Sequence, residues 1–257
     1  MSKDPAPFLW YELQTTDTKA AAAFYRHVLG HEAKASTPGT PDYTILAAGP
    51  ADVGGMMKLP DEACAAGARP GWMGYVAVDD VDAYAARVKA AGGSVLLPTR
   101  EVPGIVRFSV VADPWGAAFT LFTGLTDERR PAVPAGTPGH VGWHELLAGD
   151  GAAAFDFYSG LFGWKKAEAV DMGPMGVYQT FGAGGPAFGG MMTKPPEAPG
   201  CFWLYYFNVE AVDAALARAK EKGARLLFGP QEVPGGSFIA QLFDPQGAMF
   251  AVVGPKR

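Results

Sequence analysis

The chain has 257 residues, of which 49% are hydrophobic and 18% are charged, and its formal net charge is −5. This composition is typical of a folded globular protein rather than a disordered one. No basic stripe is visible, so we expect no nucleic-acid partner. No window approaches the roughly 18 consecutive apolar residues of a membrane span. The N-terminus has no secretory pattern, and we therefore expect a cytoplasmic protein.

Strand and helix signals alternate from the start of the chain. Residues Phe8–Thr15 alternate as a strand does, and Thr16 or Asp17 is the candidate cap for a helix over Thr18–Leu29, which Gly30 ends. Strand-like runs separated by Gly and Pro turns follow at Glu32–Ala35, Tyr43–Ala47 and Val53–Met57. The same plan then returns, with a strand from Trp72 to Val78, a helix over Val81–Ala91, and strands at Ser94–Leu97, Arg107–Val111 and Ala117–Phe122.

The second half of the sequence repeats the first. Phe24-Tyr25 returns as Phe157-Tyr158, a shift of 133 (158 − 25). Shifts of 135 and 131 relate two further pairs of segments: Gly54-Gly55-Met56-Met57 with Gly189-Gly190-Met191-Met192, and Asp113-Pro114 with Asp244-Pro245. Nearly constant shifts in the same order indicate a tandem duplication. Helices are accordingly predicted over residues 150–162 and 212–222, which makes four βαβββ units.

The repeat predicts an α+β protein of two domains. We expect the first domain over residues 1–126, a linker rich in Pro, Ala and Gly over 127–139, and the second domain over 140–257. Each βαβββ unit should form a curved mixed sheet with its helix on the convex side, which leaves the concave side for a cavity. The sequence leaves open whether units pair within or across the halves, and whether the protein is a monomer or a homodimer.

These landmarks resemble the vicinal oxygen chelate superfamily, which includes glyoxalase I, bleomycin-resistance proteins and extradiol dioxygenases. In the first half the resemblance rests on Phe24-Tyr25 with Leu29-Gly30, on Val78-Asp79-Asp80-Val81, and on Asp113-Pro114-Trp115-Gly116. It covers nearly the whole chain and implies a tandem glyoxalase-like protein. The fold does not specify one activity, because the superfamily hosts isomerases, oxygenases, thiol transferases and passive drug binders.

Metal enzymes of this superfamily use His or Glu at four inward strand positions of each domain. The resemblance places these positions, in the two halves, at Trp10 and Trp143, in the two Gly-Gly-Met-Met strands, at Met73 and Leu204, and at Thr120 and Ala251. None of these residues is a plausible ligand for a divalent metal that prefers imidazole or carboxylate. We therefore predict no metal and no other cofactor.

The alternation of side chains instead predicts an aromatic cavity with one carboxylate per half. Ligand-binding residues are predicted at Trp10, Gln14, Met56, Met73, Tyr75, Arg107, Thr120, Trp143, Met191, Leu204 and Tyr206. Glu12 and Glu145 lie at matching positions of the two halves and are the candidate catalytic residues. A carboxylate in an aromatic pocket could transfer protons, anchor a ligand, or tether a neighbouring amide or Arg107.

Three function hypotheses follow. The first is metal-independent binding of a small aromatic or polycyclic metabolite, for sequestration or resistance. The alternative is an enzyme of the isomerase, lyase or dioxygenase/hydroxylase type, which uses Glu12 and Glu145 for acid–base chemistry or a metal held by relocated ligands. A purely structural or interaction role is the third reading.

Overall fold

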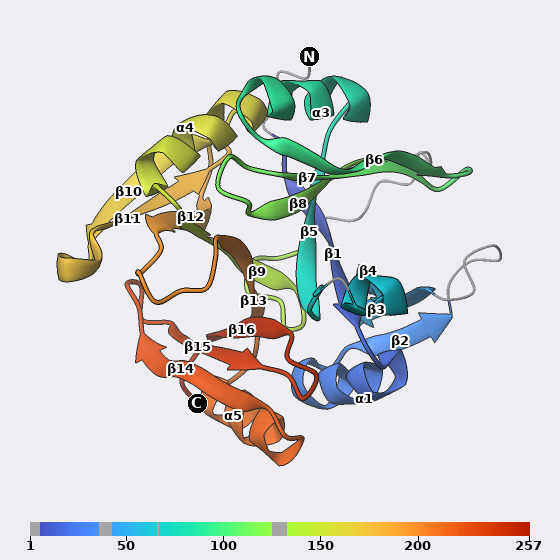
Figure 1. The fold of residues 1–257 in the computed structure, drawn as a ribbon. Coiled ribbons are helices and arrows are strands. Elements are labelled where there is room, and N and C mark those ends of the chain that lie inside the picture. The colour runs from blue at the N-terminus through green and yellow to red at the C-terminus, as the bar shows by residue number, and fades with distance from the viewer. Residues whose placement is uncertain (1–5, 36–42, 66, 125–132) are drawn as a thin grey trace. The chain divides into compact units, whose positions relative to one another are not determined.

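The computed structural model describes residues 6–35, 43–65, 67–124 and 133–257 (Figure 1). The first half contains β1 (Phe8–Thr15), α1 (Thr18–Leu29), β2 (Glu32–Ala35), β3 (Tyr43–Ala48), β4 (Ala51–Lys58), α2 (Asp61–Ala65), β5 (Gly71–Ala77), α3 (Val81–Ala90), β6 (Ser94–Val102), β7 (Val106–Ala112) and β8 (Ala118–Gly124). The second half contains β9 (Val141–Ala148), α4 (Gly151–Phe162), β10 (Lys165–Asp171), β11 (Val177–Gly182), β12 (Ala187–Thr193), β13 (Phe202–Asn208), α5 (Val212–Glu221), β14 (Arg225–Glu232), β15 (Phe238–Phe243) and β16 (Met249–Gly254), with a short 3₁₀ helix at Gly173–Met175.

The strands form two mixed sheets, as the tandem βαβββ prediction requires. One sheet has the order β2-β3-β4-β1-β5-β8-β7-β6, and the other has the matching order β10-β11-β12-β9-β13-β16-β15-β14. β1 runs parallel to β4, and β5 runs parallel to β8, whereas β2-β3-β4 and β6-β7-β8 are antiparallel. The predicted α+β class with curved mixed sheets is therefore confirmed. None of the described helices is long and apolar enough to span a membrane.

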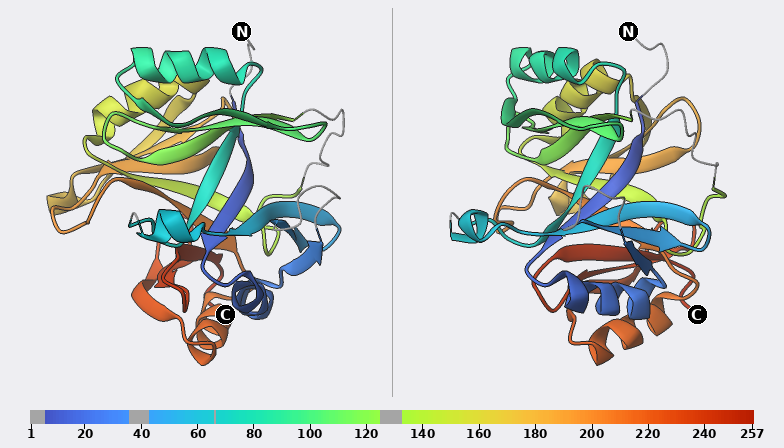
Figure 2. Two further views of the ribbon diagram at one scale, coloured as in Figure 1. Left: turned by 45° about the vertical axis from the view of Figure 1, so that its right-hand side comes forward. Right: turned by 90° about the vertical axis from the view of Figure 1, so that its right-hand side faces the viewer.

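The chain divides into two compact units, and each unit draws on both halves of the sequence. Unit 1 comprises residues 1–9, 74–129 and 144–203, and unit 2 comprises residues 10–73, 130–143 and 204–257. Helices α3 and α4 pack together in unit 1, and helices α1 and α5 pack together in unit 2 (Figure 1 and Figure 2). The domain boundaries set from the sequence stay a prediction, and the start of the predicted linker lies outside the described residues.

Local signals explain where the helices begin and end. Asp17, Asp80 and Asp150 each cap a helix, because a carboxylate oxygen accepts the backbone N–H three residues later at 3.0 Å. Gly30 ends α1 in the left-handed region at φ 76°, a conformation that residues with a Cβ adopt only with strain. Helix α5 follows Ala211, which provides no side-chain cap.

A buried chain of hydrogen bonds joins the two halves of the sequence inside unit 2. Trp72 Nε1 donates to Tyr25 Oη at 3.0 Å, and Tyr25 Oη donates to Asp244 Oδ2 at 3.1 Å. Asp244 Oδ1 also accepts the backbone N–H groups of Gln246 and Ala248, both at 2.9 Å. The Tyr of the Phe-Tyr motif and the Asp of the Asp-Pro motif are therefore joined by a hydrogen bond.

Unit 1 contains the duplicate of this chain. Trp203 Nε1 donates to Tyr158 Oη at 3.0 Å, and Tyr158 Oη donates to Asp113 Oδ2 at 3.2 Å. Burial raises the pKa of Asp113 and of Asp244, although the hydrogen bonds to these carboxylates oppose the shift. The Phe-Tyr and Asp-Pro motifs therefore have a structural role, because the tyrosine of each half forms a hydrogen bond with the buried aspartate of the other half.

The structure differs from the sequence prediction at β6. The prediction ended this strand at Leu97, just before Pro98, a residue that cannot donate a ladder hydrogen bond. The strand instead continues to Val102, and its register with β7 shifts between Leu97 and Arg100. A bulge therefore accommodates the proline.

Candidate functional site

The first candidate surface is the β1 face, which comprises Trp10, Glu12 and Gln14 of β1, Tyr43 of β3 and Met57 of β4. All of these residues belong to unit 2. Trp10 Nε1 donates to Tyr43 Oη at 2.9 Å, and Gln14 Nε2 donates to Glu12 Oε1 at 3.2 Å. Glu12 is only 6% exposed. The face thus presents an indole, a phenol and a carboxylate whose orientations are fixed by hydrogen bonds.

The Gly-Gly pair of β4 explains how Tyr43 reaches this position. A Cβ atom on Gly55 would collide with the ring and hydroxyl of Tyr43, so the tyrosine lies directly over this glycine. A Cβ atom on Gly54 would collide with the carbonyl oxygen of Tyr11 in the neighbouring strand. One glycine therefore makes room for a side chain of the candidate site, and the other allows close strand packing.

The duplicate surface in unit 1 is the β9 face, which comprises Glu145 of β9, Tyr178 of β11 and Met192 of β12. Tyr178 Oη donates to Glu145 Oε2 at 3.4 Å, and Glu145 is 9% exposed. A Cβ atom on Gly190 would collide with the Tyr178 ring, just as a Cβ atom on Gly55 would collide with the Tyr43 ring. A Tyr seated on a Gly beside a buried Glu is therefore a property of both copies.

The other predicted residues lie on further strands. In unit 1, Tyr75 pairs with Thr120, and the Tyr75 ring lies 5.8 Å from that of Phe122. Thr120 is fully buried, and its hydroxyl has no hydrogen-bond partner among the described residues.

In unit 2, Gln241 Nε2 donates to Tyr206 Oη at 2.7 Å. Leu204 is 1% exposed, whereas Met73 and Trp143 are partly exposed.

The strand register corrects the predicted site at Met56 and Met191. Met56 pairs with Leu13, and Met191 pairs with Leu146, so both methionines lie on the face opposite the candidate glutamates. Both are fully buried. The face of the candidate glutamates instead carries the following methionine of each pair, which is Met57 or Met192.

Arg107 also lies on the wrong face for the predicted role. It pairs with Thr123, whereas the neighbouring Phe108 pairs with Phe122 on the Tyr75 side. Its guanidinium bonds the carboxylate of Asp82 on α3 and lies 3.4 Å from Glu101. Hydrogen bonds from Thr99 and Arg107 hold the pKa of the Asp82 carboxyl below its usual value. Arg107 is therefore a surface ion-pair residue.

The donor set does not fit the metal that the superfamily resemblance implies. Within the described ranges, no group of three or more His, Cys, Asp or Glu side chains could hold a metal ion. His144 lies one register position from Glu145 and faces the other side, where its Nδ1 donates to the Phe188 carbonyl at 2.7 Å. His31 Nε2 donates to the Gly139 carbonyl at 2.7 Å. These buried histidines serve packing, and we derive no step through a metal.

Tyr43 and Tyr178 are the site residues that sequence reasoning missed. They are related by a shift of 135 (178 − 43), the same shift that relates the two Gly-Gly-Met-Met strands. Because the tyrosine and the Gly-Gly pair recur in the second half with the same shift, the sequence could have indicated that they contact each other. The signal was hidden because each tyrosine lies on a neighbouring strand, outside the motif.

Comparisons with known proteins show what this chain is similar to. The family model of the Glyoxalase/Bleomycin resistance protein/Dioxygenase superfamily matches residues 8–121 and 137–252. The putative glyoxylase CFP32 of Mycobacterium tuberculosis is 32% identical over 96% of this chain and 94% of its own length. The anthracycline biosynthesis protein DnrV of Streptomyces peucetius is 34% identical over 97% of this chain and 93% of its own length.

Solved structures show the same fold at low identity. The Mn(II)-bound glyoxalase from Novosphingobium aromaticivorans superposes with a TM-score of 0.65 at 18% identity, covering 97% of this chain and 81% of that chain. The 2,3-dioxygenase LapB from Pseudomonas sp. KL28 superposes with a TM-score of 0.66 at 12% identity, covering 100% of this chain and 94% of that chain. At these identities the likeness concerns the fold alone.

Proposed function

The chain belongs to the Glyoxalase/Bleomycin resistance protein/Dioxygenase superfamily, and from this premise we propose that it binds a small, flat aromatic or polycyclic metabolite without a metal ion. The β1 face and the β9 face are the proposed contact surfaces. Their aromatic rings offer stacking area, and their carboxylates offer one polar anchor each. The proposed purpose is sequestration of the metabolite or resistance to it.

The single observation that carries the proposal is the Tyr–Gly–Glu arrangement present in both copies. A core strand has no need of a glycine beneath a tyrosine, since Gly weakens a strand. In both copies a tyrosine lies over the glycine that pairs with a buried glutamate: Tyr43 lies over Gly55, which pairs with Glu12, and Tyr178 lies over Gly190, which pairs with Glu145. A ligand with hydroxyl or keto groups on flat rings would find both stacking and hydrogen-bonding partners there.

The names of the relatives support the ligand class. DnrV is described as an anthracycline biosynthesis protein, and anthracyclines are polycyclic aromatic compounds with hydroxyl and keto groups. The relative from Streptomyces sp. strain C5, DauV, carries the same description and is 33% identical to this chain. The residues at the positions where metal enzymes of the superfamily carry their ligands support metal-independent binding, because Trp, Met, Leu, Thr and Ala offer no imidazole or carboxylate.

The test is a fluorescence titration with a hydroxyanthraquinone in the presence of chelator. The variants Gly55→Ala and Gly190→Ala displace only the far ends of Tyr43 and Tyr178, so the fold should survive while the proposed surfaces change. We expect the double variant to bind at least about tenfold more weakly, a loss of roughly 1.4 kcal/mol. Gly160→Ala is the matched control, because a Cβ atom there meets nothing within 4 Å. Unchanged affinity in the double variant would overturn the proposal.

The second candidate function is catalysis by Glu12 or Glu145. It is favoured by the burial of both carboxylates and by the neutral donors, Gln14 and Tyr178, that contact them. A buried carboxylate beside a bound aromatic ketone or enol could move a proton in an isomerase or lyase reaction. In that case Glu12→Gln would keep the affinity for the metabolite and lose turnover, whereas a ligand anchor would lose affinity.

A further inference from the structure

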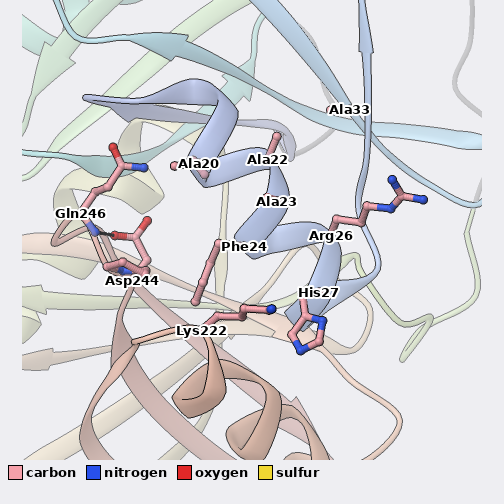
Figure 3. A pocket seen from close by; sticks show the side chains of 12 residues that line it. Ala20, Ala22, Ala23, Phe24, Arg26, His27, Ala33, Lys222, Asp244 and Gln246 are labelled. Atoms are coloured by element: carbon pink, nitrogen blue, oxygen red, sulfur yellow. Dashed lines mark hydrogen bonds between the residues drawn. The ribbon is translucent and has the colours of Figure 1, made fainter.

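Unit 2 contains a pocket whose lining includes no residue of the β1 face, and we call it the α1 pocket. It is an open pocket of about 940 Å³ between α1 and the turn that follows β15 (Figure 3). Its lining consists of Ala20, Ala21, Ala22, Ala23, Phe24, Arg26, His27, Ala33, Lys222, Asp244, Pro245 and Gln246. All of these residues belong to unit 2, so the pocket is complete within one compact body.

The duplication shows what fills the corresponding place in unit 1. Ala22 corresponds to Phe155 (155 − 22 = 133), and Ala33 corresponds to Lys166 (166 − 33 = 133). Phe155 is only 6% exposed, and the Lys166 ammonium lies 5.0 Å from its ring centroid. The same fold element thus buries an aromatic ring under a cation in unit 1, whereas unit 2 has alanine at both positions.

A second aromatic side chain is also replaced. Trp115 of unit 1 corresponds to Gln246 of unit 2 (246 − 115 = 131). The Trp115 ring lies directly over Gly149, before α4, where a Cβ atom would collide with it. Gln246 instead bonds the start of α1: its Oε1 accepts from Thr16 Oγ1 and from the Asp17 N–H, both at 2.6 Å. At two positions of the pocket lining, unit 2 therefore has an alanine and a glutamine where unit 1 has aromatic side chains.

The charges around the α1 pocket favour an acidic ligand group. Arg26 and Lys222 contribute basic side chains to its lining, and Figure 3 shows the Lys222 side chain extended below Phe24 with its terminal nitrogen toward His27. The one carboxylate of the lining, Asp244, is 4% exposed and accepts from Tyr25. Glu221 lies outside the lining and contacts His27 at 3.3 Å and Lys222 at 3.7 Å, which offsets only part of the positive charge.

We propose that the α1 pocket binds an aromatic ring that carries an acidic group. The ring takes the place that Phe155 occupies in unit 1, and the acidic group meets Lys222 and Arg26. This site shares no residue with the β1 face or the β9 face. Its occupation is independent of the function proposed for those surfaces.

The test is a fluorescence titration of the whole protein with anilinonaphthalene sulfonate, an aromatic probe with one acidic group. The variant Ala22→Phe fills the pocket with the residue that the duplicate has at this position, and Lys222→Ala introduces the residue of the duplicate, Ala91 (222 − 91 = 131). We expect each to lower the affinity for the probe at least about tenfold. Ala152→Phe, at an exposed position of α4, is the control and should leave the affinity unchanged.

The outcomes separate this proposal from the function proposed above. Gly55→Ala should leave binding of the probe intact, because neither Gly55 nor Tyr43 lines the α1 pocket. Wild-type affinity in both Ala22→Phe and Lys222→Ala would overturn the proposal. So would loss of probe binding in Gly55→Ala with retention in Ala22→Phe, because the probe would then occupy the β1 face only.

Discussion

Acid should destabilise this protein through two buried histidines, His31 and His144. His31 is 1% exposed and His144 is 6% exposed, and burial lowers the pKa of each imidazole to about 4 from its usual 6.5. His31 donates Nε2–H to a carbonyl, and its other ring nitrogen has no partner among the described residues. His144 is stacked on Phe8 at 4.6 Å. Both imidazoles are therefore neutral in the fold.

The sign and size of the effect follow from the pKa difference. Below pH 6.5 the unfolded chain binds protons that the folded chain excludes, so the free energy of unfolding falls as the pH falls from 6.5 toward 4. A shift of about 2.5 units corresponds to about 3 kcal/mol per histidine when the titration is complete. At about pH 5 the exclusion of a proton from each histidine should have lowered the free energy of unfolding by about 2 kcal/mol. The raised pKa values of Asp113 and Asp244 act in the opposite direction, so the histidine effect must be isolated by substitution.

The assay is urea unfolding at about pH 7 and pH 5 for the wild type, His31→Gln and His144→Gln. Each substitution should reduce the loss of stability between the two pH values by about 2 kcal/mol, whatever it does to stability at pH 7. An unchanged pH dependence in both buried-site variants would refute the argument that these imidazoles are neutral in the fold.

Three further predictions concern the sheets and the site. Gly54→Ala should lower stability by several kcal/mol in thermal unfolding because its Cβ meets backbone, whereas Gly55→Ala should keep the fold because its Cβ meets only the end of a side chain. Tyr25→Phe and Tyr158→Phe should each cost about 1–3 kcal/mol in urea unfolding, since each leaves a buried indole N–H and a carboxylate oxygen without a partner; costs near zero would contradict the role given to these chains. Glu12→Gln should lower affinity for a hydroxyanthraquinone in titrations if the carboxylate anchors the ligand, and equal affinity would count against that role.

The fold could be predicted from the sequence because duplication repeats every signal. The caps at Asp17, Asp80 and Asp150 and the stop at Gly30 are local features, and these helices begin and end within one residue of the predicted bounds. The five-residue helix α2 was missed, since Asp61–Ala65 has no buried residue and hence no hydrophobic period.

The site was harder to predict because its geometry depends on contacts between strands. Alternation placed Glu12 correctly relative to Gln14, yet it could not choose between Met56 and Met57, because a one-residue change of register moves a side chain to the other face. Arg107 was misplaced for the same reason. Tyr43 was missed because no local pattern shows that a ring covers Gly55.

Metal analysis combined with ligand titration tests the central claim most directly. Protein purified without chelator should be analysed for metal content, and the same sample should be titrated with a hydroxyanthraquinone before and after chelator treatment. The proposal predicts no stoichiometric metal and the same affinity in both titrations, with weaker binding when Gly55 and Gly190 are both changed to alanine. Stoichiometric Fe, Ni, Zn or Mn whose removal abolishes binding would contradict it.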